Sequence, residues 1–87
     1  MRIKEGFLIK KLDGKYIVVA IGEAGKQFHG MICMNETGAW LWEQLKEEIT
    51  EEELLARMCE SFEGIAPENA RADLEEYLNS IEQALER

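Results

Sequence analysis

The residues able to act as nucleophiles, bases or metal ligands are few and scattered along the chain. His29 is the single histidine, and no aspartate, serine or second ligand lies at a useful spacing from it. The two cysteines, Cys33 and Cys59, do not form a Cys-x-x-Cys pair. A nucleophile needs an adjacent base, and a metal site needs a cluster of ligands. The sequence therefore predicts neither a catalytic centre nor a metal site.

Pairs of carboxylates are more numerous, but they lie where they would do no acid–base work. Glu51 with Glu52, and Glu75 with Glu76, fall on helix faces that the sequence pattern predicts to be exposed. An exposed carboxylate stays ionised near neutral pH and is a poor general acid. We therefore expect a protein that is not an enzyme and needs no cofactor, which leaves recognition as its class of function.

The charge of the chain is divided unevenly between its two parts. Residues 1–34 carry six basic and three acidic side chains, whereas residues 35–87 carry four basic and fifteen acidic ones. The acidic part repels the phosphates of nucleic acids and anionic lipids, so both are disfavoured as partners. With 87 residues, the chain has room for a single domain with a small core.

The cysteines and the hydropathy pattern bear on the cellular compartment. Cys33 falls in an apolar run and Cys59 in a helical pattern, which favours two free thiols, buried or half-buried, over a disulfide. Free thiols and the lack of an apolar signal segment behind Met1 predict a cytoplasmic protein. No run of residues approaches the roughly 20 apolar positions that a membrane span needs.

The first part of the chain has the pattern of an antiparallel sheet. Residues 6–12 and 15–21 are rich in β-branched and aromatic side chains, and Asp13-Gly14 between them is a strong two-residue hairpin signal. This turn predicts a register in which Leu12 lies opposite Lys15 and Phe7 opposite Ala20. A loop follows over residues 22–30, and residues 30–34 form a third strand.

The second part has the pattern of three helices, over about residues 35–47, 50–62 and 67–86. Asn35 is a predicted N-cap, Thr50 and Glu53 form a capping box in which the Glu53 side chain reaches back to the Thr50 amide, and Pro67 suits a first helical turn. Gly38 costs about 1 kcal/mol inside a helix, which indicates close packing there. The fold class is therefore α+β, with a three-stranded antiparallel sheet followed by three helices.

The third strand is the feature that bears on recognition. A small sheet leaves edge strands with unpaired backbone groups, and an extended peptide can add to such an edge. Met31 to Met34 would offer that template together with a soft, adaptable apolar surface. From the residues alone, a docking role and a role in filling the core are equally supported.

Several segments of the chain resemble the PqqD-like family, which comprises RiPP recognition elements. The most specific is the passage from strand to helix through Asn-Glu-Thr-Gly. The segments are Glu5-Gly6-Phe7, Asp13-Gly14-Lys15-Tyr16-Ile17-Val18-Val19, Gly30-Met31-Ile32-Cys33-Met34-Asn35-Glu36-Thr37-Gly38-Ala39 and Trp42-Glu43-Gln44-Leu45. The order and spacing of the later helices agree as well, so the resemblance covers nearly the whole chain.

The resemblance implies a winged helix-turn-helix-like domain that binds the leader segment of a ribosomally made precursor peptide. In that family the leader adds to the third strand, lies against the third helix and is presented to a modifying enzyme, usually a radical S-adenosylmethionine maturase. The pathway would be PQQ biosynthesis or another peptide modification. The implied peptide-binding residues are Met31, Ile32, Cys33, Met34, Arg71, Leu74, Glu75 and Leu78. The side of the helix that faces the peptide is left open.

Two other hypotheses compete with leader binding. A winged-helix DNA-binding regulator would share the topology, although the acidic third helix argues against it. A structural subunit would use the same strand edge for self-association, and a homodimer is compatible with peptide binding.

Overall fold

A three-stranded antiparallel sheet and three longer helices make up most of the structure, a computed structural model that describes residues 1–27 and 30–86. The predicted α+β class is confirmed. In chain order the elements are β1 (Arg2–Ile3), β2 (Phe7–Leu12), β3 (Lys15–Ala20), α1 (Gly22–Gln27), β4 (Met31–Met34), α2 (Glu36–Gln44), α3 (Glu51–Ser61), α4 (Pro67–Ser80), the 3-10 turn η1 (Glu82–Ala84) and β5 (Leu85–Glu86).

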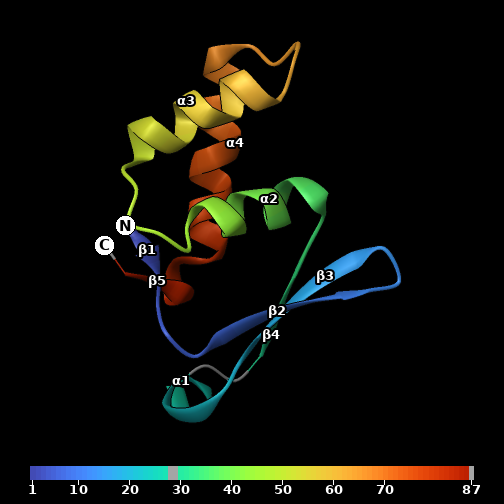
Figure 1. Cartoon of the computed structure of the whole chain (residues 1–87), viewed down its shortest axis with the longest axis vertical. Helices are drawn as coiled ribbons and strands as arrows, with labels where there is room; N and C mark the ends of the chain where they lie inside the picture. The colour runs from blue at the N-terminus through green and yellow to red at the C-terminus, as the bar shows by residue number, and fades with distance from the viewer. Residues whose placement is uncertain (28–29, 87) are drawn as a thin grey trace.

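The hairpin has the register that its turn predicts. Asp13 and Gly14 have φ values of 50° and 79°, as a two-residue turn with two left-handed positions requires. Leu12 pairs with Lys15 and Phe7 with Ala20. The strand order is β2-β3-β4, so β4 lies at an edge of the sheet (Figure 1).

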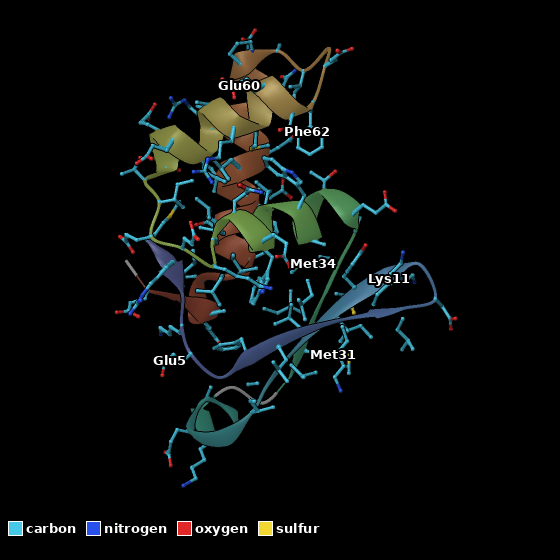
Figure 2. All side chains as sticks on the ribbon, viewed as in Figure 1. Glu5, Lys11, Met31, Met34, Glu60 and Phe62 are labelled. Carbon is cyan, nitrogen blue, oxygen red and sulfur yellow. The ribbon has the colours of Figure 1, made fainter. Side chains whose placement is uncertain are left out.

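The two faces of this sheet have different surroundings. On the inner face, Val18 is fully buried and the Phe7 ring meets the Trp42 ring of α2 at a centroid distance of 6.5 Å. On the outer face, Leu8 is 46% and Met31 61% exposed. Met34 lies between the sheet and the helices, whereas Met31 lies on the far side (Figure 2). Among the described residues, helices therefore cover one face of the sheet, and the other face is partly exposed.

The helix starts follow their caps. Asn35 Oδ1 accepts a hydrogen bond from the Gly38 N–H at 2.9 Å, and Thr50 Oγ1 accepts one from the Glu53 N–H at 3.1 Å. The Glu53 carboxylate accepts from the Thr50 hydroxyl instead of from the Thr50 amide, which differs from the predicted capping box. At the start of α4, Ala66 provides no side-chain cap.

Three boundaries differ from the sequence predictions. Residues 22–27 of the expected loop form the short helix α1, and α2 ends at Gln44. The last helix ends at Ser80, after which β5 pairs with β1. Its apolar periodicity runs on because Ile81 and Leu85, 0% and 5% exposed, pack into the core although they lie beyond the helix.

The cysteines correct another expectation. Cys33 and Cys59 are free, as predicted, but both are exposed and neither is buried or half-buried. Cys33 alternates with Ile32 and Met34 and so lies on the uncovered face of β4. Cys59 follows the buried Met58 and so lies on the solvent side of α3.

Candidate functional site

The hydrogen-bond pattern of the sheet determines which backbone groups of β4 are available. The Ile21 N–H donates to the Gly6 oxygen at 2.6 Å, next to the last pair of the β2–β3 ladder. Hydrogen-bonded and non-bonded pairs alternate along an antiparallel ladder. Counting back from Ile21, Tyr16 and Val18 are in non-bonded pairs with β2. Their backbone groups therefore point toward β4.

The same alternation places the remaining groups of β4. Met34 and Ile32 are the register partners of Tyr16 and Val18, so their backbone groups bond to β3. The N–H and C=O groups of Met31 and Cys33 therefore point away from the sheet, where no other strand lies among the described residues. We call this side of β4 the open edge. It offers two donors and two acceptors to an extended chain.

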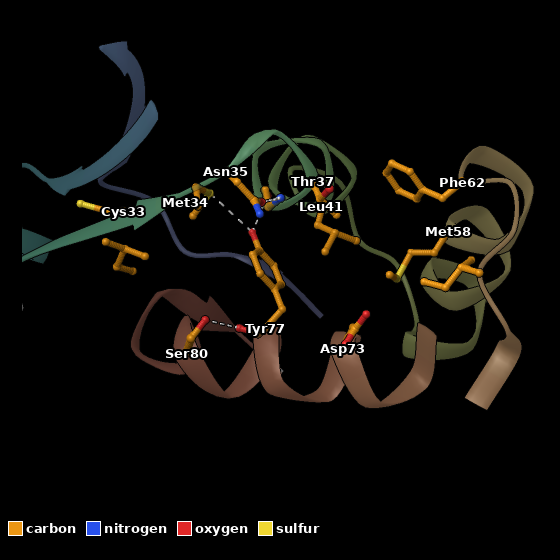
Figure 3. A pocket seen from close by; sticks show the side chains of 13 residues that line it. Cys33, Met34, Asn35, Thr37, Leu41, Met58, Phe62, Asp73, Tyr77 and Ser80 are labelled. Atoms are coloured by element: carbon orange, nitrogen blue, oxygen red, sulfur yellow. Dashed lines mark hydrogen bonds between the residues drawn. The ribbon is translucent and has the colours of Figure 1, made fainter. Parts of the chain in front are cut away.

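A cavity of about 560 Å³ lies beside the open edge, between β4, α2, the end of α3 and α4 (Figure 3). Most of the side chains around it are apolar. The residues that line it are Ile32, Cys33, Met34, Asn35, Thr37, Gly38, Leu41, Met58, Phe62, Ile65, Asp73, Tyr77 and Ser80. Its near end is formed by β4 with Ser80, and its far end by Met58, Phe62 and Asp73 (Figure 3).

Tyr77 of α4 contacts both α2 and β4 at the near end of the cavity. Its hydroxyl donates to the Gly38 carbonyl oxygen of α2 at 2.8 Å and lies 3.8 Å from the Met34 sulfur of β4. Burial raises the pKa of the Tyr77 phenol well above its usual value, because the phenolate would lose its hydration there. Tyr77 is thus a neutral donor that fixes the spacing of α2 and α4.

Gly38 allows this close approach. A Cβ atom at position 38 would lie 2.9 Å from the Met34 Cβ and 3.2 Å from Tyr77 Cε1. Both distances are shorter than ordinary carbon–carbon contacts of about 3.5–4.0 Å. The close packing that the sequence predicted at this glycine is confirmed.

Asp73 is the charged residue among the described residues that line the cavity. Its side chain is exposed and has no hydrogen bond or ion pair with any residue in the described part of the chain. From α4 the carboxylate points toward Met58 and Phe62 (Figure 3). The far end of the cavity is therefore an apolar surface with one unpaired negative charge.

The structure brings together one of the two predicted sets of binding residues. Ile32, Cys33 and Met34 line the cavity, and Met31 contributes its backbone to the open edge. The set on α4 lies elsewhere. Leu74 and Leu78 are each 1% exposed and belong to the core. Arg71 bonds to Glu52 at 3.2 Å, and Glu75 lines a separate pocket together with Glu51.

The side of α4 that does face the cavity presents Asp73, Tyr77 and Ser80. Their spacing of four and three residues places them in one row along the helix. This row borders the buried stripe through Leu74 and Leu78, so periodicity alone allowed either border to face the cavity. One sequence signal could have decided which border faces the cavity. A glycine in one helix, here Gly38, leaves space for an aromatic ring from another helix, and Tyr77 supplies such a ring from this row.

Other kinds of site receive no support from the described residues. No three His, Cys, Asp or Glu side chains in residues 1–27 and 30–86 are grouped so that they could hold a metal ion. His29 lies outside the described residues. No helix in the described part of the chain has both the length and the apolar character to cross a membrane.

Comparisons with known proteins agree with this architecture. The family described as coenzyme PQQ synthesis protein D (PqqD) matches residues 15–84. No curated protein sequence matches the chain significantly. Among solved structures, TbiB1 in complex with the TbiA(beta) leader peptide is similar, with a TM-score of 0.75 and 18% sequence identity. The alignment covers 99% of this chain and 95% of that chain.

Proposed function

Because the chain belongs to the PqqD family, we propose that it binds the leader segment of a ribosomally synthesised precursor peptide as an added strand on β4. The observation that carries the proposal is the open edge of β4 beside an apolar cavity. A structure with the same fold contains a leader peptide, which supports this class of ligand. Strand addition gives affinity through the backbone, and the adjoining pocket gives specificity through side chains.

The bonding pattern predicts how the peptide lies. The peptide would bond to the backbone of Met31 and Cys33, the two residues whose groups point outward. Since side chains alternate along a strand, every second residue of the peptide would face the helices and enter the cavity. The remaining residues would extend the outer face of the sheet beside Met31.

We further propose that the bound peptide is presented to a modifying enzyme, a radical S-adenosylmethionine maturase of PQQ biosynthesis or of another peptide-modification pathway. The proposal rests on the family. These 87 residues contain two cysteines, too few to hold an iron–sulfur cluster, so the maturase would be a separate protein. The outer face of the sheet stays exposed when a strand is added to the edge. It therefore leaves room for a second macromolecule.

A titration followed by amide NMR tests peptide binding. The probes are synthetic leader peptides from short reading frames that neighbour the gene of this protein. We expect the amide signals of Met31 and Cys33 and of the row Asp73, Tyr77 and Ser80 to shift. Shifts confined to other surfaces, or none with any of these leaders, would count against the proposal.

A proline at the open edge separates backbone pairing from contacts of the side chain. Cys33→Pro removes an outward N–H and leaves the β3–β4 bonds of Ile32 and Met34 in place, which edge strands tolerate. We expect it to lower leader affinity by about tenfold or more. Cys33→Ala keeps the N–H and should bind nearly normally. N-methylation of the peptide tests the same bonds without altering the protein.

A further inference from the structure

The far end of the cavity combines features that suit one kind of side chain. Met58, Phe62 and Ile65 provide apolar walls, and Asp73 places a carboxylate at their margin. A lysine or arginine has a long apolar stem with a cationic end, so it can pack its stem along such walls and keep its charge at the margin. A neutral apolar side chain would fill the same space but leave the carboxylate without a partner.

The electrostatic surroundings favour a cation there. Among the described residues that line the cavity, none is a lysine or an arginine. The nearby cation of α4, Arg71, already bonds to both Glu52 oxygens, at 3.2 and 3.3 Å. Residues 35–87 also carry a large excess of acids, which attracts cationic peptides over longer distances.

We infer that Asp73 is a specificity-determining residue, which selects peptides with a lysine or arginine just beyond the segment that pairs with β4. The inference rests on the proposed function, because it assigns a position to the peptide that occupies the cavity. Asp73 lies one helical turn before Tyr77, and Tyr77 contacts Met34 at the end of β4. A peptide that leaves the open edge at Met34 therefore reaches Asp73 within a few residues.

A selection from a random library tests the inference without knowledge of the natural leader. Random 12-residue peptides displayed on phage are selected on the immobilised full chain and on three variants. Wild type should enrich alternating apolar residues with a lysine or arginine at one fixed position. Asp73→Asn should keep the apolar pattern and lose the basic preference, and Asp73→Lys should select an acidic residue at that position. Glu68→Gln removes an exposed charge from the same helix, outside the cavity, and should select as wild type does.

Synthetic peptides then give the size of the effect. With the wild-type consensus peptide, Asp73→Asn should weaken binding about three- to fivefold at low salt, and less at high salt. Replacing the basic residue of the peptide by alanine should cost more in wild type than in Asp73→Asn, where only the packing of its apolar stem is lost. Each variant is compared with wild type by circular dichroism and by thermal unfolding.

The possible failures are distinguishable. Apolar patterns without a basic position in wild type, or with one that persists in Asp73→Asn, would overturn the inference and leave peptide binding intact. Enriched peptides that leave the amide signals of Met31 and Cys33 unshifted, or an absence of enriched peptides for wild type and every variant, would overturn the proposed function itself. If Asp73→Asn is unstable, Asp73→Lys provides the test instead. A preference of this variant for peptides with an acidic residue at the same position would support the inference, and no such preference would overturn it.

Discussion

At the scale of single residues, the contact between Gly38 and Tyr77 sets the geometry of the cavity. The helix α2 begins beside β4, and its first turn lies close enough to α4 for the Tyr77 hydroxyl to reach the Gly38 carbonyl. Side chains of ordinary size would hold these elements apart. The contact therefore matters for stability and for the width of the cavity together.

Gly38→Ala should destabilise the fold although alanine is the better helix former. The added methyl group would lie 2.9 Å from the Met34 Cβ, and such overpacking costs more than the helix preference of about 1 kcal/mol returns. We expect the free energy of unfolding to fall by about 1–2 kcal/mol in urea denaturation. Gly25→Ala is the matched control. Its methyl group would meet the Ala20 oxygen at 3.4 Å, so equal losses in both variants would contradict the explanation.

Tyr77 should make stability fall at alkaline pH. In the unfolded chain its phenol ionises near pH 10. In the folded chain burial raises its pKa, so the proton is held to higher pH. The contribution of Tyr77 to the free energy of unfolding is therefore fully present below about pH 10. Above that pH the free energy of unfolding falls by up to about 1.4 kcal/mol per pH unit.

Urea denaturation between pH 8 and 11 measures this effect in wild type and Tyr77→Phe. The difference in unfolding free energy between the two proteins should be constant up to about pH 10 and then change in favour of the phenylalanine variant. Tyr16→Phe keeps the Tyr77–Gly38 hydrogen bond and should retain the alkaline loss due to Tyr77. Parallel curves for wild type and Tyr77→Phe would contradict the assignment.

At the scale of elements, α3 and α4 start in different ways. Thr50 caps α3 with its hydroxyl, whereas Ala66 before α4 has an extended backbone and no side-chain acceptor. Ala66→Ser should therefore add a cap and raise the free energy of unfolding by about 1 kcal/mol, and Thr50→Ala should lower it by a similar amount. Chemical denaturation of both variants checks this. A loss of stability in Ala66→Ser would show that its surroundings do not admit the hydroxyl.

Elements specified by neighbouring residues could be predicted from the sequence. The Asp13-Gly14 turn determines the hairpin register because its backbone twist and length leave one pairing, and Asn35 and Thr50 determine where helices begin. The α1 helix was missed because its six residues include two glycines, which favour turns in the absence of tertiary contacts.

The candidate site was only partly predictable, because it depends on how elements pack. The apolar run Met31 to Met34 and its place at the sheet edge follow from strand patterns. The sequence does not determine which side of α4 faces the cavity, because both borders of its buried stripe carry polar or mixed residues. In the sequence, Asp73 therefore looks like any other exposed acid of α4. Only its position opposite residues of α2 and α3 distinguishes it.

At the scale of the whole molecule, the uneven charge distribution argues against the DNA-binding hypothesis. The exposed acids of α4 face solvent, and Arg71 is already paired with Glu52. We expect no shift of duplex DNA in gel electrophoresis at low salt, where phosphate contacts are strongest. Duplex binding that weakens as salt is raised would revive the hypothesis.

The open edge also connects self-association with peptide binding. A second copy could pair with β4 through the same backbone groups that a peptide would use. Any dimer formed in this way should therefore dissociate when a binding peptide is added, as measured by light scattering. A dimer that persists with bound peptide would have to use another surface, such as the exposed outer face around Leu8 and Met31.

The packing of Phe62 has a practical consequence. Phe62 lines the cavity and also meets the half-buried Trp40 ring edge-on, at a centroid distance of 5.0 Å. The other tryptophan, Trp42, is 1% exposed in the core, so its emission should change little when a peptide binds. A peptide side chain that enters the far end of the cavity would contact Phe62 and should thereby change the surroundings of the Trp40 indole. The unlabelled protein thus carries its own optical probe, so tryptophan emission in a stopped-flow instrument would give association rates without a dye.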